Sequence, residues 1–395
     1  MTTSDKKIFA VLFFSIFVSV TGVGIVVPLL PVYAYELGAS GLYIGLVFGA
    51  FSLSRTFFLP YFGRLSDKKG RKPLIVAGLL AYALISIGFI LSKNVETLII
   101  MRFIQGISSA MLIPVIQAYV GDITPEGSEG LSMGMFNMSM FFGLSLGPLA
   151  GGMINEHFSL NTSFLCMGIL AFLGFSLCLF LLPPTKSERA VSRKKEVVSW
   201  KKLLRDKDLA GLFLFRFAYA ACVGVVWGFL PVLADSEFHL SSSYIGILVM
   251  LGVFIAGVMQ TPMGYMADRF NKRIMILIGG FIIAFAILLF NWADGFGDLF
   301  IANVLIGIGG GIAMPALMAL AVLKGNTTKA MGSVMGIITM AHSSGMLTGS
   351  LVAGLMMDMF QLRHAFSFGS LIMILGTGLF FFYTYHMKEK PLKTE

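Results

Sequence analysis

The sequence predicts an all-α integral membrane protein whose twelve transmembrane helices form two pseudo-symmetric six-helix bundles. Hydrophobic residues make up 57% of the 395 residues and charged residues only 12%, whereas a soluble domain carries about a quarter charged residues. A helix needs about 20 apolar residues to cross a bilayer, far more than a barrel strand needs. Twelve stretches meet this requirement, at roughly 8–34, 41–62, 74–92, 97–120, 131–153, 162–182, 209–232, 243–263, 274–292, 297–322, 332–355 and 365–386.

An internal repeat with an offset of 201 residues indicates that the helices form two homologous halves. The loop at 63–72 (GRLSDKKGRK) recurs at 264–273 (GYMADRFNKR), and the Tyr-Ile-Gly at 43–45 recurs at 244–246. A repeat that stays in register at separated places means that one structural unit occurs twice. In a membrane chain, two like halves are typical of transporters whose substrate path runs between them.

The only long polar stretch, 183–207, predicts the boundary between the halves. It divides the chain into an N-terminal six-helix bundle at 1–182, a cytoplasmic basic linker, and a C-terminal six-helix bundle at 208–395. Residues 200–204 within the linker could form a short amphipathic helix on the membrane surface. The three cysteines fall inside predicted helices, where we expect apolar filler and no disulfide. No pattern of catalytic, metal-ligating or nucleotide-binding residues occurs, so we expect no enzyme, no cofactor and no metal site.

The distribution of positive charge predicts the orientation in the membrane. Twelve spans place both termini on one side, and nearly all of the 29 Lys and Arg fall on that side. The other side has only Lys93 and Arg363, and three arginines lie inside spans. Because cationic loops stay cytoplasmic, we expect a multi-pass plasma (inner) membrane protein with both termini in the cytoplasm. The net charge of +9 is therefore explained without nucleic acid, and contact with anionic lipid headgroups is a secondary expectation.

The loop at 63–72 carries a carboxylate that a simple basic anchor would not need. Asp67 lies near the inner end of the second span. There it could accept hydrogen bonds from the N-terminus of a neighbouring helix, or pair with Arg71 or another cation. Gly70 would permit the tight reversal of the chain. The alternative is that the loop serves only as a basic topology anchor.

Two further motifs lie inside predicted spans. The fourth span contains Arg102 followed by Phe-Ile-Gln-Gly at 103–106. The fifth contains small residues on adjacent turns with one proline, which would let another helix approach and could bend the chain. The matching span of the second half repeats the glycines but has Ser350 in place of the proline. General small-residue packing is the alternative to a dedicated gate.

These motifs together resemble the major facilitator superfamily over essentially the whole chain, and its twelve-helix drug/proton antiporters in particular. The resemblance implies the major facilitator fold, alternating access, and a conformational latch at the two loops. The implied latch residues are Gly63, Asp67, Gly70, Arg71, Lys72, Gly264, Asp268, Lys272 and Arg273. The implied coupling or core residues of the fourth span are Arg102, Gln105 and Gly106. The implied antiporter-type helix carries Gly143, Gly147, Pro148, Gly151 and Gly152.

Each arginine inside a span is a candidate functional residue, because charge is costly at membrane depth. Arg102 is either a core or proton-relay group, as the resemblance implies, or a shallow arginine that extends to the outer headgroups. Arg55 and Arg216 lie deeper, where a guanidinium should line a wet cavity, pair with a carboxylate, or extend to the inner surface.

The acids depart from the pattern of many drug/proton exporters. The place in the first span where such exporters carry a carboxylate holds Ser19, and no acid lies near the membrane midplane. His342 is the only midplane group with a suitable pKa for proton exchange, although a neutral hydrogen-bonding histidine is the alternative. The missing acid weakens the prediction of proton coupling.

The remaining polar candidates could line a substrate cavity or could bond between helices. Those assigned to the cavity are Arg55, Asn137, Arg216, Trp227 and Gln260. The first functional hypothesis is a secondary exporter of amphipathic or drug-like small molecules, driven by proton antiport. The second is a carrier of organic anions or anionic lipids that uses Arg55 and Arg216 without proton coupling. We expect a small-molecule substrate, protons and membrane lipids as partners, no nucleic acid, and a functional monomer.

Overall fold

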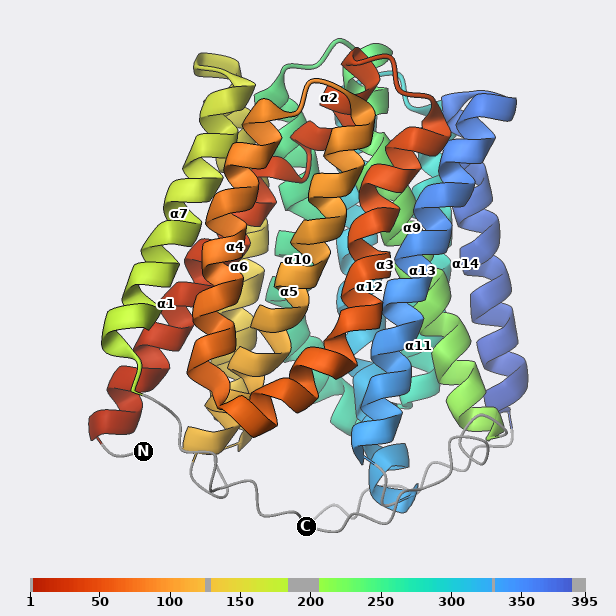
Figure 1. Ribbon diagram of the computed structural model, residues 1–395. Helices are drawn as coiled ribbons and strands as arrows, with labels where there is room; N and C mark the ends of the chain where they lie inside the picture. The colour runs from red at the N-terminus through yellow and green to blue at the C-terminus, as the bar shows by residue number, and fades with distance from the viewer. Residues whose placement is uncertain (1–2, 125–128, 184–205, 329–330, 386–395) are drawn as a thin grey trace. The chain divides into compact units, whose positions relative to one another are not determined.

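The computed structural model of the protein is helical in every regular element that it describes (Figure 1). It describes residues 3–124, 129–183, 206–328 and 331–385, and leaves out the side chains of 3, 4, 67, 129–134, 331 and 332. The predicted surface helix at 200–204 lies outside these residues.

The helices follow one another in an order that repeats. The first half contains α1 (Thr3–Val26), α2 (Leu29–Glu36), α3 (Gly41–Lys69), α4 (Arg71–Leu91), α5 (Val95–Ile123), α6 (Glu129–His157) and α7 (Leu160–Leu181). The second half contains α9 (Lys207–Ser236), α10 (Ser242–Arg269), α11 (Lys272–Leu289), η2 (Phe290–Trp292), α12 (Phe296–Thr328), α13 (Met331–Met359) and α14 (Leu362–Thr384).

Ten helical segments of the described chain are long and apolar enough to cross a membrane, and α1 with α2 counts as one of them. The other two helices, α6 and α13, have 29 residues each. At 1.5 Å per residue that is about 44 Å of helix, more than the hydrocarbon thickness of about 30 Å. The prediction of an all-α membrane fold with twelve helices is confirmed for the described residues.

The first predicted span, 8–34, is interrupted. Helix α1 ends at Val26, and α2 begins at Leu29 directly after Pro28. Proline has no N–H to continue the helical ladder, and its ring disfavours a helical residue before it. The two helices therefore form one membrane span, which is interrupted near its C-terminal end.

The described chain divides into two units. Unit 1 comprises Met1–Ala39, Leu46–Arg193 and His239–Met250. Unit 2 comprises Ser40–Gly45, Lys194–Phe238 and Leu251–Glu395. This division differs from the predicted bundles at two helix starts. The first turn of α3 belongs to unit 2, and the start of α10 belongs to unit 1.

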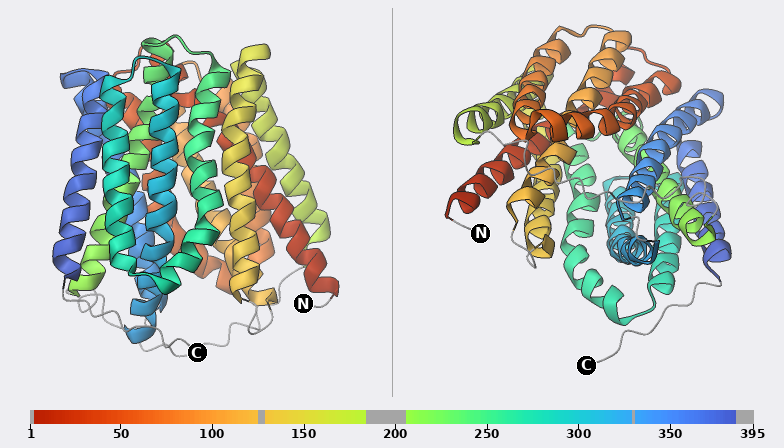
Figure 2. Two further views of the ribbon diagram at one scale, coloured as in Figure 1. Left: turned by 180° about the vertical axis from the view of Figure 1, so that it is seen from behind. Right: turned by 60° about the horizontal axis from the view of Figure 1, so that its bottom comes forward.

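Both units use the same packing scheme. In unit 1, α1 packs on α6 and α7, and α4 packs on α5 and α7. In unit 2, α9 packs on α13 and α14, while α11, teal in Figure 2, packs on α12 and α14. Each pair in unit 1 thus has its counterpart in unit 2, in the same order along the chain. The structural repeat follows the sequence repeat.

Small residues carry much of this packing. Lipid tails are as apolar as Leu, so helices associate in a membrane through close van der Waals contact more than through burial from water. Unit 1 has an apolar core that includes Leu12, Ile16, Ile75, Leu79 and Ile116. Glycines set how closely its helices approach, as described below.

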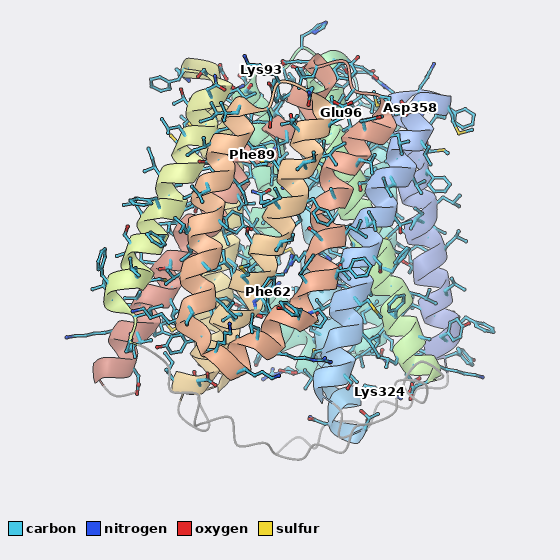
Figure 3. All side chains as sticks on the ribbon, in the orientation of Figure 1. Phe62, Phe89, Lys93, Glu96, Lys324 and Asp358 are labelled. Atoms are coloured by element: carbon cyan, nitrogen blue, oxygen red, sulfur yellow. The ribbon has the colours of Figure 1, made fainter. Side chains whose placement is uncertain are left out.

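Each unit has two distinguishable ends. In unit 2, Lys324 and Asp358 lie at opposite ends (Figure 3). Lys324 Nζ lies 2.8 Å from Asp206 Oδ2 and 2.8 Å from Asp208 Oδ2, at the start of α9. We call this the terminal end, because the first helix of the unit begins there, and the opposite one the far end. In unit 1 the terminal end is where α1 begins and α7 ends.

Candidate functional site

The first copy of the repeated loop lies at the terminal end of unit 1, between α3 and α4. Gly70 caps the start of α4 with a φ of +87°, which side chains other than glycine rarely adopt. The backbone of Asp67 belongs to α3, but its side chain lies outside the described residues. Its role as a latch stays a prediction.

The cations of this loop bind to helix ends within unit 1. Arg71 Nε donates to Asp122 Oδ2 at 3.2 Å, and its Nη1 donates to Ser66 Oγ at 2.5 Å. Lys72 Nζ donates to the carbonyl of Leu182 at 2.5 Å. The loop therefore ties α3 and α4 to the ends of α5 and α7. Asp122 was not predicted as a partner of Arg71.

The second copy of the loop, between α10 and α11, reverses the chain without a glycine in a positive-φ conformation. Asn271 stands where the first copy has Gly70, and it adopts an ordinary φ of −65°. Its side chain accepts a hydrogen bond from the Ile274 amide at 3.1 Å, which caps α11. Arg273 donates to Thr384 Oγ1 and to the Tyr385 carbonyl, each at 3.3 Å. Arg273 in unit 2 thus holds the end of the last helix, as Lys72 does in unit 1.

Four other predicted latch residues take no part in these bonds. Gly63 and Gly264 lie in open surroundings, with no atom within 4 Å of the place a Cβ would occupy. Asp268 is exposed on the last turns of α10, while Lys272 is buried at the start of α11.

The glycines of α6 face α1. A Cβ on Gly143, Gly147 or Gly151 would meet the backbone of α1, at the carbonyls of Phe17, Thr21 and Ile25 respectively. Only glycine permits this approach along two turns of helix. The next residue, Gly152, instead meets the backbone of Ser242 in the part of α10 that belongs to unit 1. Pro148 lies inside α6, which continues through it.

The glycines of α13 repeat this arrangement in unit 2. A Cβ on Gly345 or Gly349 would meet the carbonyl of Phe217 or Ala221 on α9. A Cβ on Gly354 would meet the carbonyl of Gly41, in the first turn of α3. Close approach of α13 to its neighbours therefore does not require a proline. Of the two matching helices, α6 contains Pro148 and α13 contains none. A gating role for the α6 motif remains a proposal.

Arg102 is buried inside unit 1, with 3% of its side chain exposed. Its Nε donates to the Val47 carbonyl at 3.0 Å, and its Nη1 donates to Gln105 Oε1 at 2.7 Å. The Arg102 Cζ lies 5.1 Å and 4.7 Å from the ring centroids of Phe48 and Phe51, where cation–π attraction stabilises a desolvated guanidinium. The alternative of an arginine extending to the headgroups is therefore excluded.

Gly106 completes the contact between α5 and α3. A Cβ there would overlap the Phe51 carbonyl and the Ser54 hydroxyl. Arg102, Gln105 and Gly106 thus lie on one face of α5 and fix it against α3. This face organises the interior of unit 1.

Arg55 on α3 is a second arginine in the interior of unit 1. Its Nε is buried and has no hydrogen-bond partner in the described structure. The Tyr82 hydroxyl on α4 lies within electrostatic range of Arg55 and Arg102 and beside the hydroxyl of Ser109. The Ser109 Oγ is also buried and makes no hydrogen bond of ordinary geometry. No carboxylate of the described residues is among the electrostatic partners of Arg55.

Arg216 occupies a comparable environment in unit 2. Its Nη1 lies 2.8 Å from Met314 Sδ, a weak acceptor, and its Cζ lies 5.6 Å from the Tyr219 ring centroid. The Arg216 Nε is buried without a hydrogen-bond partner in the described residues, and no carboxylate is among its electrostatic partners. Among the described residues, each unit therefore contains a deep guanidinium with no acid among its electrostatic partners.

The other predicted cavity residues are dispersed. Asn137 is exposed on α6 in unit 1. Trp227 on α9, Gln260 on α10 and His342 on α13 are half-buried in unit 2. The structure brings none of them into hydrogen-bonding contact with Arg55 or Arg216. The sequence did not predict that Tyr82 lies beside Ser109 and within electrostatic range of Arg55, because the three residues belong to three different helices.

Two membrane-spanning units of the same packing form a membrane protein built from an internal repeat, an arrangement that is typical of secondary transporters. The family model described as Major Facilitator Superfamily matches residues 12–236 and again 212–395. The chain belongs to the major facilitator superfamily, so it is a transporter and not an enzyme. The predicted resemblance and fold are confirmed.

Over most of its length, the chain is also similar to members of this superfamily that are named for drug resistance. The chain is 28% identical over 386 residues to Multidrug resistance protein 2 of Bacillus subtilis, covering 95% of this chain and 94% of that protein. It is 27% identical over 369 residues to Quinolone resistance protein NorA of Staphylococcus aureus, covering 90% of each. A bacterial homolog of the human lysosomal transporter Spinster shares the fold, with a TM-score of 0.81, 13% identity, and coverage of 98% of both chains.

Proposed function

We propose that this protein exports amphipathic or drug-like small molecules by alternating access, in exchange for protons. The observation that carries the proposal is its similarity, over nine-tenths or more of the chain, to proteins named for multidrug and quinolone resistance. The α6 glycines packed on α1 and the buried Arg102 of α5 support it, since both belong to motifs that resemble the drug/proton antiporters.

The proposal includes an orientation and a coupling group. The terminal ends carry the basic loops, so we place them in the cytoplasm of a cell with a plasma (inner) membrane. His342 on α13 is the proposed proton carrier, because the spans offer no acid near the midplane. The loops at 63–72 and 264–273 are the proposed latches on the cytoplasmic side, and one chain suffices for transport.

Transport in vesicles tests the export mechanism. Purified protein in liposomes should accumulate a fluoroquinolone or a lipophilic cationic dye when the interior is acidic, and should move protons outward when the compound is added. A His342→Gln variant should lose the proton movement and retain dye binding. Empty liposomes and a protonophore provide the controls. Compound uptake without any dependence on the pH gradient would contradict proton antiport.

A second candidate function is the transport of organic anions or anionic lipids. It is favoured by the two guanidinium groups, Arg55 in unit 1 and Arg216 in unit 2, whose buried Nε atoms have no hydrogen-bond partner among the described residues. A buried cation without an acid is costly, so an anionic ligand would complete its environment. The Tyr82 and Ser109 hydroxyls could donate to the same anion as Arg55.

Binding measurements separate the two candidates. The double variant Arg55→Gln, Arg216→Gln should weaken binding of an anionic amphipathic dye at least tenfold, because two charged donors are lost. It should leave binding of a cationic dye unchanged or stronger. The matched control is Arg269→Gln, which removes an exposed arginine stacked on the Tyr265 ring. Equal anion binding by the double variant and the control would exclude the anion carrier.

A further inference from the structure

Helix α5 lies against α3 in a fixed register. The Arg102 Nε donates to the Val47 carbonyl at 3.0 Å, across a separation of 55 residues in the chain. A Cβ on Gly106, one turn further along α5, would overlap the carbonyl of Phe51, one turn further along α3. Residue numbers thus rise together along the two helices, so α3 and α5 run in the same direction with this constant offset.

Helix α4 lies against α5 in a register that is also fixed, but in the opposite direction. A Cβ on Gly78 of α4 would lie 2.8 Å from Leu112 Cγ of α5. A Cβ on Gly88, further along α4, would overlap Met101 Sδ, which lies earlier along α5. The numbers along α4 rise as those along α5 fall, so these two helices are antiparallel (Figure 1).

These registers bring Arg55, Tyr82 and Ser109 to one level of unit 1. The offset between α3 and α5 sets Ser109 level with Ser54, the residue before Arg55. The antiparallel register of α4 sets Tyr82 opposite Ser109, and its hydroxyl lies beside the Ser109 hydroxyl and within electrostatic range of Arg55. Three helices each contribute one polar side chain, and we call these three residues the α3–α5 polar cluster.

The polar cluster offers hydrogen-bond donors without a matching acceptor. The Arg55 Nε and the Ser109 Oγ are buried and have no hydrogen-bond partner among the described residues. Ser109 and Tyr82 are 1% and 4% exposed. The guanidinium N–H can only donate, and each hydroxyl can turn its O–H toward an acceptor. Buried polar groups are normally satisfied, so this arrangement indicates a bound acceptor.

The charge around the polar cluster is also unbalanced. Tyr82 is an electrostatic partner of both Arg55 and Arg102, and no carboxylate of the described residues is a partner of either. The hydrogen bonds of Arg102 go to neutral acceptors, the Val47 carbonyl and the Gln105 side chain. A buried cation without an opposite charge is strongly destabilising. The interior of unit 1 therefore favours an anion that its described side chains do not supply.

We propose that unit 1 binds a chloride ion at the α3–α5 polar cluster, as a fixed counter-ion for its buried arginines. A monatomic anion accepts hydrogen bonds from any direction, so it can take the Arg55 N–H and both hydroxyls although they come from three helices. Arg102 lies about 10 Å from Ser109 along α5, near enough for the ion to lower the cost of its charge in a low-dielectric interior. The ion is part of unit 1 and is not transported, so the inference stands apart from the proposed function.

Arg216 of unit 2 has a different environment. Its Nη1 lies 2.8 Å from Met314 Sδ, and Tyr219 is its electrostatic partner among the described residues. Tyr219 lies one turn from Arg216 on the same helix, α9. Donors from three helices do not converge on Arg216 in the described structure, so we place the ion in unit 1 alone.

Chloride titration of the purified full chain tests the proposal without any transport. Sodium gluconate is replaced stepwise by sodium chloride at constant ionic strength. An ion that binds the folded state stabilises it, so the unfolding temperature should rise and level off, and bromide should act like chloride. Arg55→Gln should weaken the apparent chloride affinity at least tenfold, because a charged donor is lost. Tyr82→Phe and Ser109→Ala, which each remove one neutral donor, should weaken it at least threefold.

Three matched controls remove the same chemical groups elsewhere. Ser108→Ala removes a hydroxyl that donates to the Ile104 carbonyl at 3.1 Å, and Tyr119→Phe removes one that donates to the Pro183 carbonyl at 3.2 Å. Arg216→Gln removes the deep guanidinium of unit 2. All three variants should keep the chloride affinity of the parent. Loss of chloride affinity in the Arg216 variant would overturn the assignment to unit 1.

Direct binding of radioactive chloride gives a second readout that does not depend on unfolding. The parent should retain one ion per chain, the Tyr82 and Ser109 variants should retain less at the same concentration, and a saturating anionic amphipathic dye should not displace the ion. Displacement by the dye would make the polar cluster a substrate site and overturn the fixed counter-ion. Absence of saturable chloride binding would overturn the site itself. Neither failure would affect proton-driven export, which the vesicle measurements test separately.

Discussion

Replacing Gly147 with alanine is expected to lower the unfolding temperature of the protein and to reduce transport at least tenfold. A Cβ at this position would lie 2.6 Å from the Thr21 carbonyl oxygen and 2.6 Å from the Gly24 Cα. Both are backbone atoms of α1 and cannot move aside as a side chain could. Overpacking of this kind costs about 1–3 kcal/mol, and separating α1 from α6 disturbs the pair that organises unit 1.

Gly378→Ala is the matched control for this substitution. Gly378 also lies inside a membrane-spanning helix, α14, but no atom lies within 4 Å of the added Cβ. Since alanine is the better helix former by about 1 kcal/mol, this variant should be as stable as the parent or more so. Thermal unfolding of the purified variants in detergent checks both results. Equal unfolding temperatures for the two variants would contradict the packing role of Gly147.

Replacing Arg102 with lysine is expected to destabilise unit 1 and to reduce transport at least tenfold, although the charge is kept. A lysine has no planar fork of donors, so it cannot reproduce the two bonds to Val47 and Gln105 together with the contact to the rings of Phe48 and Phe51. A buried acceptor left without its donor costs about 1–3 kcal/mol. Thermal unfolding and vesicle transport measure the two effects.

Arg269→Lys is the control for the loss of the guanidinium alone. Arg269 stacks on the Tyr265 ring at 4.1 Å from its centroid, and it is exposed at the end of α10. Exposed cation–π pairs contribute only about 0.5–1 kcal/mol, so this variant should transport normally. A lysine at 102 that matches the control in stability and transport would show that charge alone is required there.

The two loops at 63–72 and 264–273 were located correctly from the sequence, but their binding partners were not. The sequence repeat located both reversals, and the positive φ of Gly70 agrees with the residue type. The partner of Arg71 could not be predicted, because Asp122 lies 51 residues further along the chain, at the end of another helix. In the second copy Asn271 stands in place of the turn glycine, and its side chain caps α11 at an ordinary φ, so no positive φ is needed there.

The hydroxyls beside Arg55 show the same limit. A search for costly buried charge finds Arg55 in the sequence, but it passes over the uncharged side chains of Tyr82 and Ser109. Both residues became candidates only when α4 and α5 placed them beside Arg55.

The membrane class, the twelve helices, the repeat and the resemblance to the family could all be predicted from the sequence. These properties depend on local composition and periodicity, because a helix in lipid must satisfy its own backbone and must be apolar over its length. Only the packing of the helices shows that Arg102 is enclosed and that Arg55 and Arg216 have no acid beside them among the described residues. Those facts depend on which helices approach each other, and helix packing at small residues is a property of paired surfaces and not of either sequence segment alone.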